Sequence, residues 1–393
     1  MRLLFVKERL VWPRSSGHDV HTYYSMQALS RLGHAIGLIT LDELDTNAIE
    51  GCHLQDKWCL EADASMLPTV STEFSFSKSQ EKFRSYWGIE KSYIQRIGQI
   101  ADEWQADAVI VVGLNVLPYL GAVKNAVRVW YAADEWVWHH LSQIQLFKPA
   151  SWGELKQAIL KGLYERAFAP LLDRVWMVSE ADKRAINRVV GIINVDVLPN
   201  GVDTEHYQPL AVQCIPNSCT FWGRLDFGPN IQALEWFCSK VWSGVRQLVP
   251  DARFTVYGFQ PTEMVKRLIK PELGIELHIN LPDLRKEIAR HQVVVLPFVS
   301  GGGIKNKLLE AAAMGKAIIG SARTFEGLSA GNAVQLATQP EHWFQRLIGL
   351  WKNTEQRNQL GIHARDWVNQ EHTWKAVALK AVEGLDASLV GKR

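Results

Sequence analysis

The 393-residue sequence has no uninterrupted apolar run near the roughly 20 residues that a membrane-spanning helix needs. Its five cysteines are scattered and never form a C-x-x-C pair, which argues against a disulfide framework and against a zinc site. The formal net charge is only +2, so no strong electrostatic field favours nucleic acid as a partner. These absences indicate a globular protein with reduced, structural thiols, no cysteine-based zinc site and no nucleic-acid partner.

Apolar residues make up 47% of the chain, and one hydrophobic core rarely serves so long a chain, so two domains are expected. The first apolar stretch, residues 2–6, is too short for a signal peptide and is followed closely by charges. We therefore expect a cytoplasmic protein.

Short apolar runs typical of buried strands alternate with helical periodicity along the chain. The predicted strands are residues 2–6, 35–40, 107–112, 127–132, 174–179, 219–223, 253–258, 275–279, 292–298 and 316–321. This alternation predicts an α/β fold in which helices cover both faces of parallel sheets. Residues 41–106 are irregular, and we expect only peripheral helices or loops there.

The turn sequence PNG, at residues 199–201, separates the two series of strands, and after about residue 340 only helical periodicity remains. We predict two doubly wound, Rossmann-like domains, at residues 1–198 and 199–369. The last segment, 370–393, is predicted to be a C-terminal helix that packs back on the first domain.

Three consecutive glycines, 301–303, stand between the predicted strand 292–298 and a helical run that begins near Ile304. In open parallel sheets ligands bind beyond the carboxyl ends of the strands, where a helix start offers free N–H groups and the positive end of its dipole. Lys305 and Lys307 are unfavourable beside that dipole unless an anion neutralises them. The segment therefore predicts a phosphate site.

Glu310 lies three residues after Lys307 on adjoining parts of one helical face, where its carboxylate can accept hydrogen bonds from sugar hydroxyls. Pairing with Lys307 on a solvated face is the alternative. Arg224, in the sequence GRLD after another strand, can clamp a phosphate with its rigid guanidinium group, although a surface arginine would be the simpler interpretation if it stood alone.

Together these motifs resemble the retaining glycosyltransferases of family 4, which have the GT-B fold of two facing Rossmann-like domains. The resemblance covers nearly the whole chain and rests on PRSSGHD, PNGVD, GRLD, LPDLRKEIARHQVVVLPF, GGGIKNKLLEAAAMGKAIIG and FEGLS, in that order. The variant GGGIKNKLLEA is similar to a bacterial subgroup that acts in exopolysaccharide and cell-surface glycan assembly.

The resemblance implies a UDP- or GDP-linked sugar as donor, a glycan or lipid-linked acceptor, and neither cofactor nor metal. The donor-binding residues that it implies are Gly17, Arg224, Gly301, Gly302, Gly303, Ile304, Lys305, Asn306 and Glu310. Two positions depart from the family. Gly302 stands where most members have the first of two glutamates, and the lysine that many members carry after the arginine of GRLD is missing, with Lys305 as a plausible substitute.

The candidate catalytic residues are Asp134, His18 and Lys305. Asp134 follows a strand of the first domain and is interpreted as a contact to an acceptor hydroxyl or to a base, with a helix N-cap as the alternative. His18 lies in the N-terminal glycine loop, which by resemblance faces the reacting sugar. The resemblance also implies retention through front-face attack, in which the leaving phosphate helps to deprotonate the acceptor.

The segment at residues 151–173 carries Lys156, Lys161 and Arg166 around an apolar stripe with Trp152. Such a helix either rests on an anionic membrane that presents a lipid-linked acceptor or packs against the sheet of the first domain. Peripheral contact with the inner face of the membrane therefore stays open at this point.

The sequence favours a metal-independent, retaining glycosyltransferase of surface polysaccharide synthesis. A sugar-nucleotide epimerase of the same fold is an alternative, but the chain offers no evident carboxylate cluster for it. A non-catalytic nucleotide-sugar-binding subunit is a second alternative, suggested by Gly302. A dehydrogenase is disfavoured because SSGHDV lacks the G-x-G-x-x-G pattern.

Overall fold

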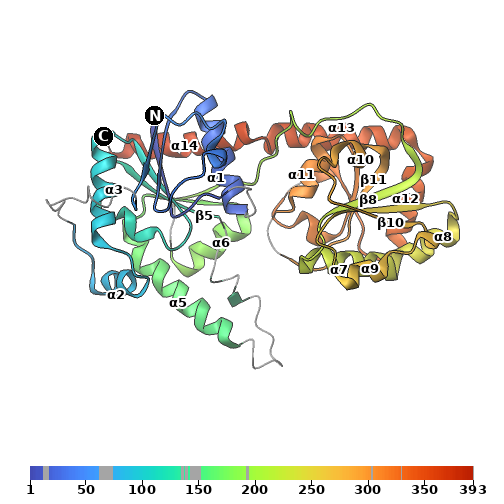
Figure 1. The fold of residues 1–393 in the computed structure, drawn as a ribbon, viewed down its shortest axis with the longest axis horizontal. Coiled ribbons are helices and arrows are strands. Elements are labelled where there is room, and N and C mark those ends of the chain that lie inside the picture. The colour runs from blue at the N-terminus through green and yellow to red at the C-terminus, as the bar shows by residue number, and fades with distance from the viewer. Residues whose placement is uncertain are drawn as a thin grey trace. The chain divides into compact units, whose positions relative to one another are not determined.

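The computed structural model describes residues 1–11, 17–61, 74–133, 137, 140–141, 152–191, 194–301, 304–328 and 330–392. The chain divides into two compact units (Figure 1). Unit 1 consists of Met1–Pro199 and Trp374–Arg393, and unit 2 consists of Asn200–Thr373. The chain therefore passes from one unit to the other twice.

Unit 1 contains a parallel sheet of seven strands in the order β3-β2-β1-β4-β5-β6-β7. The strands are β1 (Arg2–Lys7), β2 (Ala35–Thr40), β3 (Asp56–Cys59), β4 (Ala108–Val112), β5 (Val127–Ala133), β6 (Arg174–Met177) and β7 (Val195–Val197). Strand β4 is buried along its whole length because it lies in the middle of the sheet and both of its faces are covered. The strand order reverses between β1 and β4.

Helices cover both faces of this sheet. They are α1 (Gly17–Arg31), α2 (Lys78–Tyr86), α3 (Lys91–Glu103), α5 (Gly153–Phe168), α6 (Glu180–Val189) and α14 (Trp374–Lys392). One core cluster joins α3 and α5 to the sheet, through Ile97 and Phe168 among others. The other cluster joins α1 and α14, which lie in contact in Figure 1, through Leu29 and Leu385.

Unit 2 contains a parallel sheet of six strands in the order β10-β9-β8-β11-β12-β13. The strands are β8 (Ile215–Arg224), β9 (Arg253–Phe259), β10 (Ile275–Ile279), β11 (His291–Leu296), β12 (Ala317–Gly320) and β13 (Gln335–Leu336). The strand order reverses between β8 and β11, so the loops that follow these two strands part in opposite directions.

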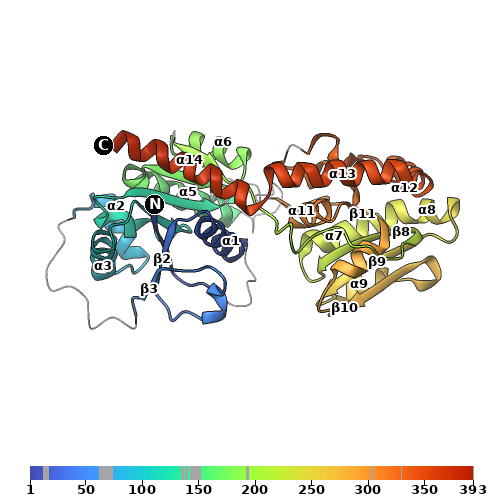
Figure 2. The ribbon, with the colours of Figure 1, turned by 90° about the horizontal axis from the view of Figure 1, so that it is seen from above.

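The helices of unit 2 are α7 (Gly228–Trp236), α8 (Ser243–Leu248), α9 (Glu263–Leu268), α10 (Arg285–Arg290), α11 (Asn306–Ala313), α12 (Pro340–Lys352) and α13 (Thr354–Glu371). A π-helical turn, Phe237–Trp242, joins α7 to α8. Helix α12 packs against β8, β11 and β12 and buries Trp343 and Leu347. Helices α11 and α13 lie side by side in Figures 1 and 2.

The prediction of two parallel α/β domains with a helical C-terminal segment is confirmed. Three edge strands, β3, β7 and β13, were not predicted from the sequence, and β3 lies in the stretch for which only helices or loops were expected. The first unit continues through Pro199, whereas the predicted boundary followed residue 198. The C-terminal helix α14 begins at Trp374 and not at residue 370, since α13 continues through Glu371. Within the described residues, no helix is both long and apolar enough to cross a membrane.

Candidate functional site

The reversal of strand order between β8 and β11 makes their carboxyl ends the expected position of a ligand in unit 2. Strand β8 ends at Arg224, close to the start of α7, and the chain after β11 leads through Gly301 to α11. Helix α11 begins at Asn306, two residues later than the sequence pattern suggested, and this puts Lys305 at its N-cap.

Two glycines let neighbouring side chains approach the main chain closely at this point. Gly223 has φ of +145°, and a Cβ atom there would lie 2.6 Å from Cε of Lys307. Gly301 has φ of +86°, and a Cβ atom there would lie 2.9 Å from Cγ of Pro229. A side chain at either position would be strained and would displace its neighbour. Gly302 and Gly303, also predicted to bind the donor, lie outside the described residues.

Lys307 and Glu310 enter a polar network beneath these loops. Nζ of Lys307 donates to Oδ1 of Asn230 at 3.3 Å, and Nδ2 of Asn230 donates to the carbonyl oxygen of Arg224 at 2.7 Å. Nε1 of Trp222 donates to Oε2 of Glu310 at 2.9 Å. Trp222 and Asn230 are buried, so the network holds the two charged side chains in defined positions.

Burial acts on both charged groups of the network and in opposite directions. It raises the pKa of Glu310, while the Trp222 hydrogen bond and the charge of Lys307 act to lower it. Burial lowers the pKa of Lys307, and the charge of Glu310 acts to raise it. Each group thus favours the ionised form of the other, and an anion beside Lys307 would further favour the lysine cation.

Lys305 occupies a different environment. Its Nζ donates to the carbonyl oxygen of Gly301 at 3.0 Å and lies 5.7 Å from the centre of the Phe298 ring. Burial lowers the pKa of Lys305 to about 8, with Glu326 acting to raise it and Arg323 acting to lower it. An anion bound nearby would restore the charged form of this lysine.

The remaining predicted donor residues of unit 2 lie at the same end of the sheet. Arg224 is exposed, and its guanidinium group is paired with Asp226, at 2.8 Å and 3.1 Å. Such an exposed pair contributes little stability, so the guanidinium group can exchange Asp226 for a phosphate at small cost. Ile304 is half-buried, and Oδ1 of the exposed Asn306 accepts a hydrogen bond from Nδ2 of Asn200 at 2.8 Å.

The predicted residues of unit 1 lie at the start of α1. Gly17 and His18 are its first two residues, and Thr22 donates to the carbonyl oxygen of His18 at 2.6 Å. The next residue, Asp19, forms an ion pair of 2.9 Å with Lys7 at the carboxyl end of β1, which fixes the first turn of α1 at that edge of the sheet. Asp134 lies outside the described residues.

Sequence reasoning missed Trp222 and Asn230. Trp222 reads as one more apolar residue of a strand, and Asn230 as part of the turn sequence FGPN. Only the fold brings Trp222 to Glu310, 88 residues later in the chain. The one signal in the sequence for Asn230 was its position, as a polar residue shortly after the GRLD loop.

Two family descriptions match the sequence. "Glycosyl transferases group 1" matches residues 216–353, and "Glycosyltransferase Family 4" matches residues 15–206. The chain belongs to the family 4 glycosyltransferases. The predicted family is therefore confirmed, while comparison with curated protein sequences finds no match.

Solved structures confirm the GT-B fold of this glycosyltransferase. TarM, from S. aureus, has a TM-score of 0.70 at 11% identity, covering 98% of this chain and 99% of its own. Sucrose-phosphate synthase from Thermosynechococcus elongatus has a TM-score of 0.66 at 13% identity over the whole of both chains. Anabaena HepE in complex with UDP has a TM-score of 0.65 at 14% identity, covering 98% of this chain and 100% of its own.

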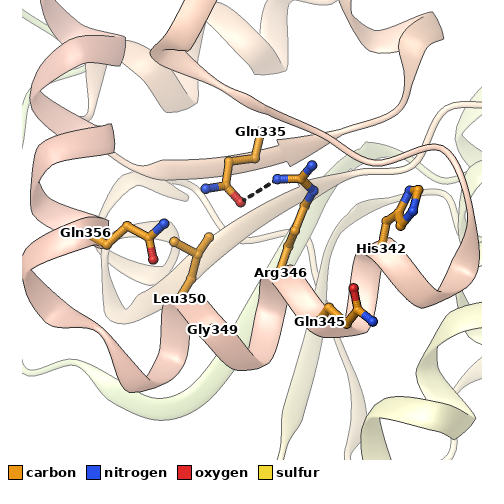
Figure 3. A pocket seen from close by; sticks show the side chains of 7 residues that line it. All are labelled: Gln335, His342, Gln345, Arg346, Gly349, Leu350 and Gln356. Atoms are coloured by element: carbon orange, nitrogen blue, oxygen red, sulfur yellow. Dashed lines mark hydrogen bonds between the residues drawn. The ribbon is translucent and has the colours of Figure 1, made fainter.

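A separate polar cavity of about 370 Å³ lies between β13, α12 and α13 of the glycosyltransferase (Figure 3). Arg346 and Gln335 point toward each other there, and Nη1 of Arg346 donates to Oε1 of Gln335 at 3.3 Å. Gln335 is the first residue of β13, so this cavity lies toward the amino ends of the strands. It contains none of the predicted site residues.

Proposed function

We propose that this glycosyltransferase transfers a sugar, with retention and without a metal, from a UDP- or GDP-linked donor to a glycan or lipid-linked acceptor in surface polysaccharide synthesis. The observation that carries the proposal is the network of Lys307, Glu310, Trp222 and Asn230 at the ends of β8 and β11. Anabaena HepE, a structural neighbour, has been solved with UDP and with UDP-glucose, which supports the choice of donor.

In this proposal the diphosphate lies at the start of α11. Lys305, Lys307 and the free N–H groups of the helix supply positive charge, and Arg224 joins them by leaving Asp226. Glu310 binds the ribose. Because Trp222 donates to Oε2 of Glu310, Oε1 is available to accept from a ribose hydroxyl.

The chemistry then needs charge stabilisation on the leaving diphosphate. As the bond between the anomeric carbon and the phosphate oxygen breaks, the lysines and the helix dipole stabilise the new negative charge, so the mechanism requires no metal or other cofactor. The acceptor oxygen forms its bond from the same face, and its proton passes to the leaving phosphate. His18 and Asp134 are proposed to contact the reacting sugar and the acceptor hydroxyl.

Helix α5 supports a lipid-linked acceptor and a peripheral position on the cytoplasmic face of the membrane. Trp152, at its start, and Ile159 and Leu163 within it are all more than half exposed, at 51%, 56% and 52%. Lys156 and Arg166 are exposed on the same helix. An exposed apolar stripe with cations beside it suits the interface of an anionic bilayer.

Calorimetric titration in the presence of a chelator, with UDP, GDP, ADP, CMP and dTDP, tests the donor site. We expect one diphosphate to bind selectively, and Glu310→Ala to weaken it by about 1 to 3 kcal/mol through loss of the ribose hydrogen bond. Glu355→Ala, on the exposed surface of α13, is the matched control. If none of the five nucleotides binds to the parent protein, the proposed donor site is wrong.

Turnover separates the proposal from its main alternative. A non-catalytic nucleotide-sugar-binding subunit would bind the nucleotide with the same dependence on Glu310 but would release no diphosphate from the nucleotide sugar. Slow hydrolysis of the donor in the absence of an acceptor would already favour the enzyme.

A further inference from the structure

The polar cavity of about 370 Å³ lies beside the edge strand β13, and one face of α12 forms much of its wall (Figure 3). Five lining residues recur at the spacing of one helical face: His342, Gln345, Arg346, Gly349 and Leu350. Gln335 of β13 and Gln356 of α13 complete the lining. None of these residues is assigned to the donor, so a molecule bound here is a second ligand.

Arg346 is a half-buried cation without an anionic partner. Within the described residues its one hydrogen bond runs from Nη1 to Oε1 of Gln335, at 3.3 Å, and no ion pair involves it. The half-buried Arg128 and Arg174 of unit 1 each pair with an aspartate instead, at 3.2 Å and 2.7 Å. A charge withdrawn from water is costly unless it is paired, so an anion in the cavity would stabilise this arginine.

The other polar groups that line the cavity also favour an oxygen-rich anion. Of the described residues in its wall, none is acidic. Because Oε1 of Gln335 accepts from Arg346, its amide nitrogen is left to donate to a ligand. Nδ1 of His342 lies 3.2 Å from Oγ1 of Thr338, which leaves Nε2 for a ligand. The exposed amide of Gln356 can both donate and accept.

Gly349 provides a second, independent observation. It lies inside α12, where glycine is less favourable than alanine. Its φ is not positive, and a Cβ atom there would meet no other atom within 4 Å, so neither the backbone conformation nor close packing of the described chain requires glycine. The missing side chain instead leaves the helix surface open where the cavity lies, as close approach of a ligand to the main chain requires.

These features select one class of ligand. The volume is at the lower end of the range of small-molecule sites and suits about one sugar ring rather than a nucleotide. A neutral sugar would leave Arg346 without an anion, whereas a bare phosphate ion would leave most of the cavity empty. The hydroxyl groups of a sugar donate and accept, as the amides of the wall do, and Leu350 supplies apolar surface for its C–H groups.

We propose that this cavity binds a monosaccharide that carries one acidic group, with the acidic group on Arg346. A sugar phosphate and a sugar carboxylate present the same chemistry to the arginine. The inference goes beyond the proposed function and does not depend on it, because the ligand lies outside the donor site.

Calorimetric titration of the full chain with glucose 6-phosphate, glucuronate and glucose tests the site, since these three sugars differ only at C6. Inorganic phosphate is the fourth probe. We expect one acidic sugar to bind about tenfold or more tightly than glucose and than inorganic phosphate, because only the acidic sugar uses both the cation and the amides. The tighter of the two acidic sugars identifies the acidic group.

Two variants of the cavity locate the binding. Arg346→Gln should weaken the acidic sugar about tenfold through loss of the charge. Gly349→Glu should abolish binding, because its carboxylate would stand one turn from Arg346 and repel the anion. This second variant stays informative if Arg346→Gln folds poorly, since a Cβ atom at Gly349 meets open space. Arg267→Gln, exposed on α9, is the control.

The proposed phosphate site at α11 attracts the same anions, so each titration is repeated with Lys307→Met. We expect the acidic sugar to bind to Lys307→Met as it binds to the parent protein. Loss of binding in Lys307→Met, with none in Arg346→Gln or Gly349→Glu, would place the ligand in the donor site and overturn the proposal. The proposal is also wrong if neither acidic sugar binds, or if glucose or inorganic phosphate binds as tightly as the acidic sugars.

Discussion

The two lysines at the start of α11 have different surroundings although they are only two residues apart. Lys307 turns toward Gly223 and Asn230 at the end of β8, whereas Lys305 donates to the carbonyl oxygen of Gly301. The sequence interpretation chose Lys305 to replace the lysine that is missing after Arg224. The geometry favours Lys307 for that role, because it lies against the strand that carries the GRLD loop.

Replacing Lys307 with Met keeps most of the side-chain volume and removes the charge. We expect the affinity for the preferred nucleoside diphosphate to fall by about 1.5 to 3 kcal/mol, the usual range for charged hydrogen bonds, and the affinity for the nucleoside alone to change little. Calorimetric titration of both ligands measures the difference. Lys352→Met, exposed at the end of α12, is the control, and an unchanged diphosphate affinity in Lys307→Met would limit Lys307 to balancing Glu310.

If Lys305 binds the diphosphate as proposed, we expect donor binding to depend on pH. Its pKa is about 8 in the folded protein, below the ordinary value of 10.5, because burial disfavours the cation. A bound diphosphate favours the cation and raises this pKa, so binding takes up a proton at a pH above 8 and the affinity falls as the pH rises through that range. Below that range Lys305 is already protonated and no uptake is expected from it.

Titration at about pH 9, in two buffers of different ionisation enthalpy, counts the protons, because Lys305 is then largely neutral in the free protein. We expect up to one proton per diphosphate, and less in Lys305→Met. Lys240→Met, an exposed lysine elsewhere in unit 2, should keep the full uptake. Equal uptake in parent and Lys305→Met would assign the proton to another group.

The sequence predicts the role of a site residue when that role depends on residues next to it in the chain. It does not when the role depends on residues that only folding brings close. The phosphate role proposed for the stretch from Gly301 to Glu310 could be predicted from the sequence because strand, glycines and helix follow one another. The hydrogen bond from Trp222 to Glu310 is invisible, because it depends on how β8 and α11 pack. Which of Lys305 and Lys307 turns inward depends on the helix start, which the pattern placed two residues too early.

At the scale of elements, the sequence predicted the interior strands of both described sheets and the edge strand β10, but not the edge strands β3, β7 and β13. The strand β4 has a continuous apolar sequence because both faces are covered. The edge strand β3, with the sequence DKWC, is partly exposed and carries charges, and β13 is only two residues long. Edge strands need little apolar surface, so their sequences resemble loops.

Helix α5 combines the two alternatives that its sequence left open. One face, with Ala158, Tyr164 and Phe168, is buried in the core of unit 1. The opposite side exposes Trp152, Ile159 and Leu163, with Lys156 between them. Packing on the sheet therefore does not exclude contact with a bilayer.

A vesicle-binding assay tests this face of α5. We expect the protein to sediment with vesicles that contain an anionic phospholipid and much less with neutral ones, because apolar insertion and cation attraction act together. Changing Ile159 and Leu163 together to Ser should reduce binding to anionic vesicles several-fold, without unfolding, since both side chains are exposed. Leu248→Ser, an exposed leucine of unit 2, should leave binding unchanged, and equal loss in both variants would mean that α5 is not the contact.

At the scale of the whole molecule, the chain joins the two units by two segments, at Pro199–Asn200 and at Thr373–Trp374. On the side of unit 2, Val202 pairs with Thr373, and its N–H group donates to the carbonyl oxygen of His372 at 2.8 Å. On the side of unit 1, His21 contacts both segments, donating from Nε2 to the carbonyl oxygen of Leu198 at 3.2 Å and packing against the ring of Trp374. Each unit thus has its own core and makes its own contacts with both connecting segments.

Separate cores predict separate unfolding transitions, and the donor should act on only one of them. Leu385→Ala in α14 and Leu347→Ala in α12 each remove a fully buried side chain, at an expected cost of about 2 to 5 kcal/mol, and they assign the transitions to units 1 and 2 in a calorimetric scan. The preferred nucleotide, at about 100 times its Kd, should stabilise by about 2.7 kcal/mol the transition that Leu347→Ala lowers. If the nucleotide instead raises the transition that Leu385→Ala lowers, donor binding is not confined to unit 2. If both variants lower a single common transition, the two units unfold together and the prediction of separate transitions is wrong.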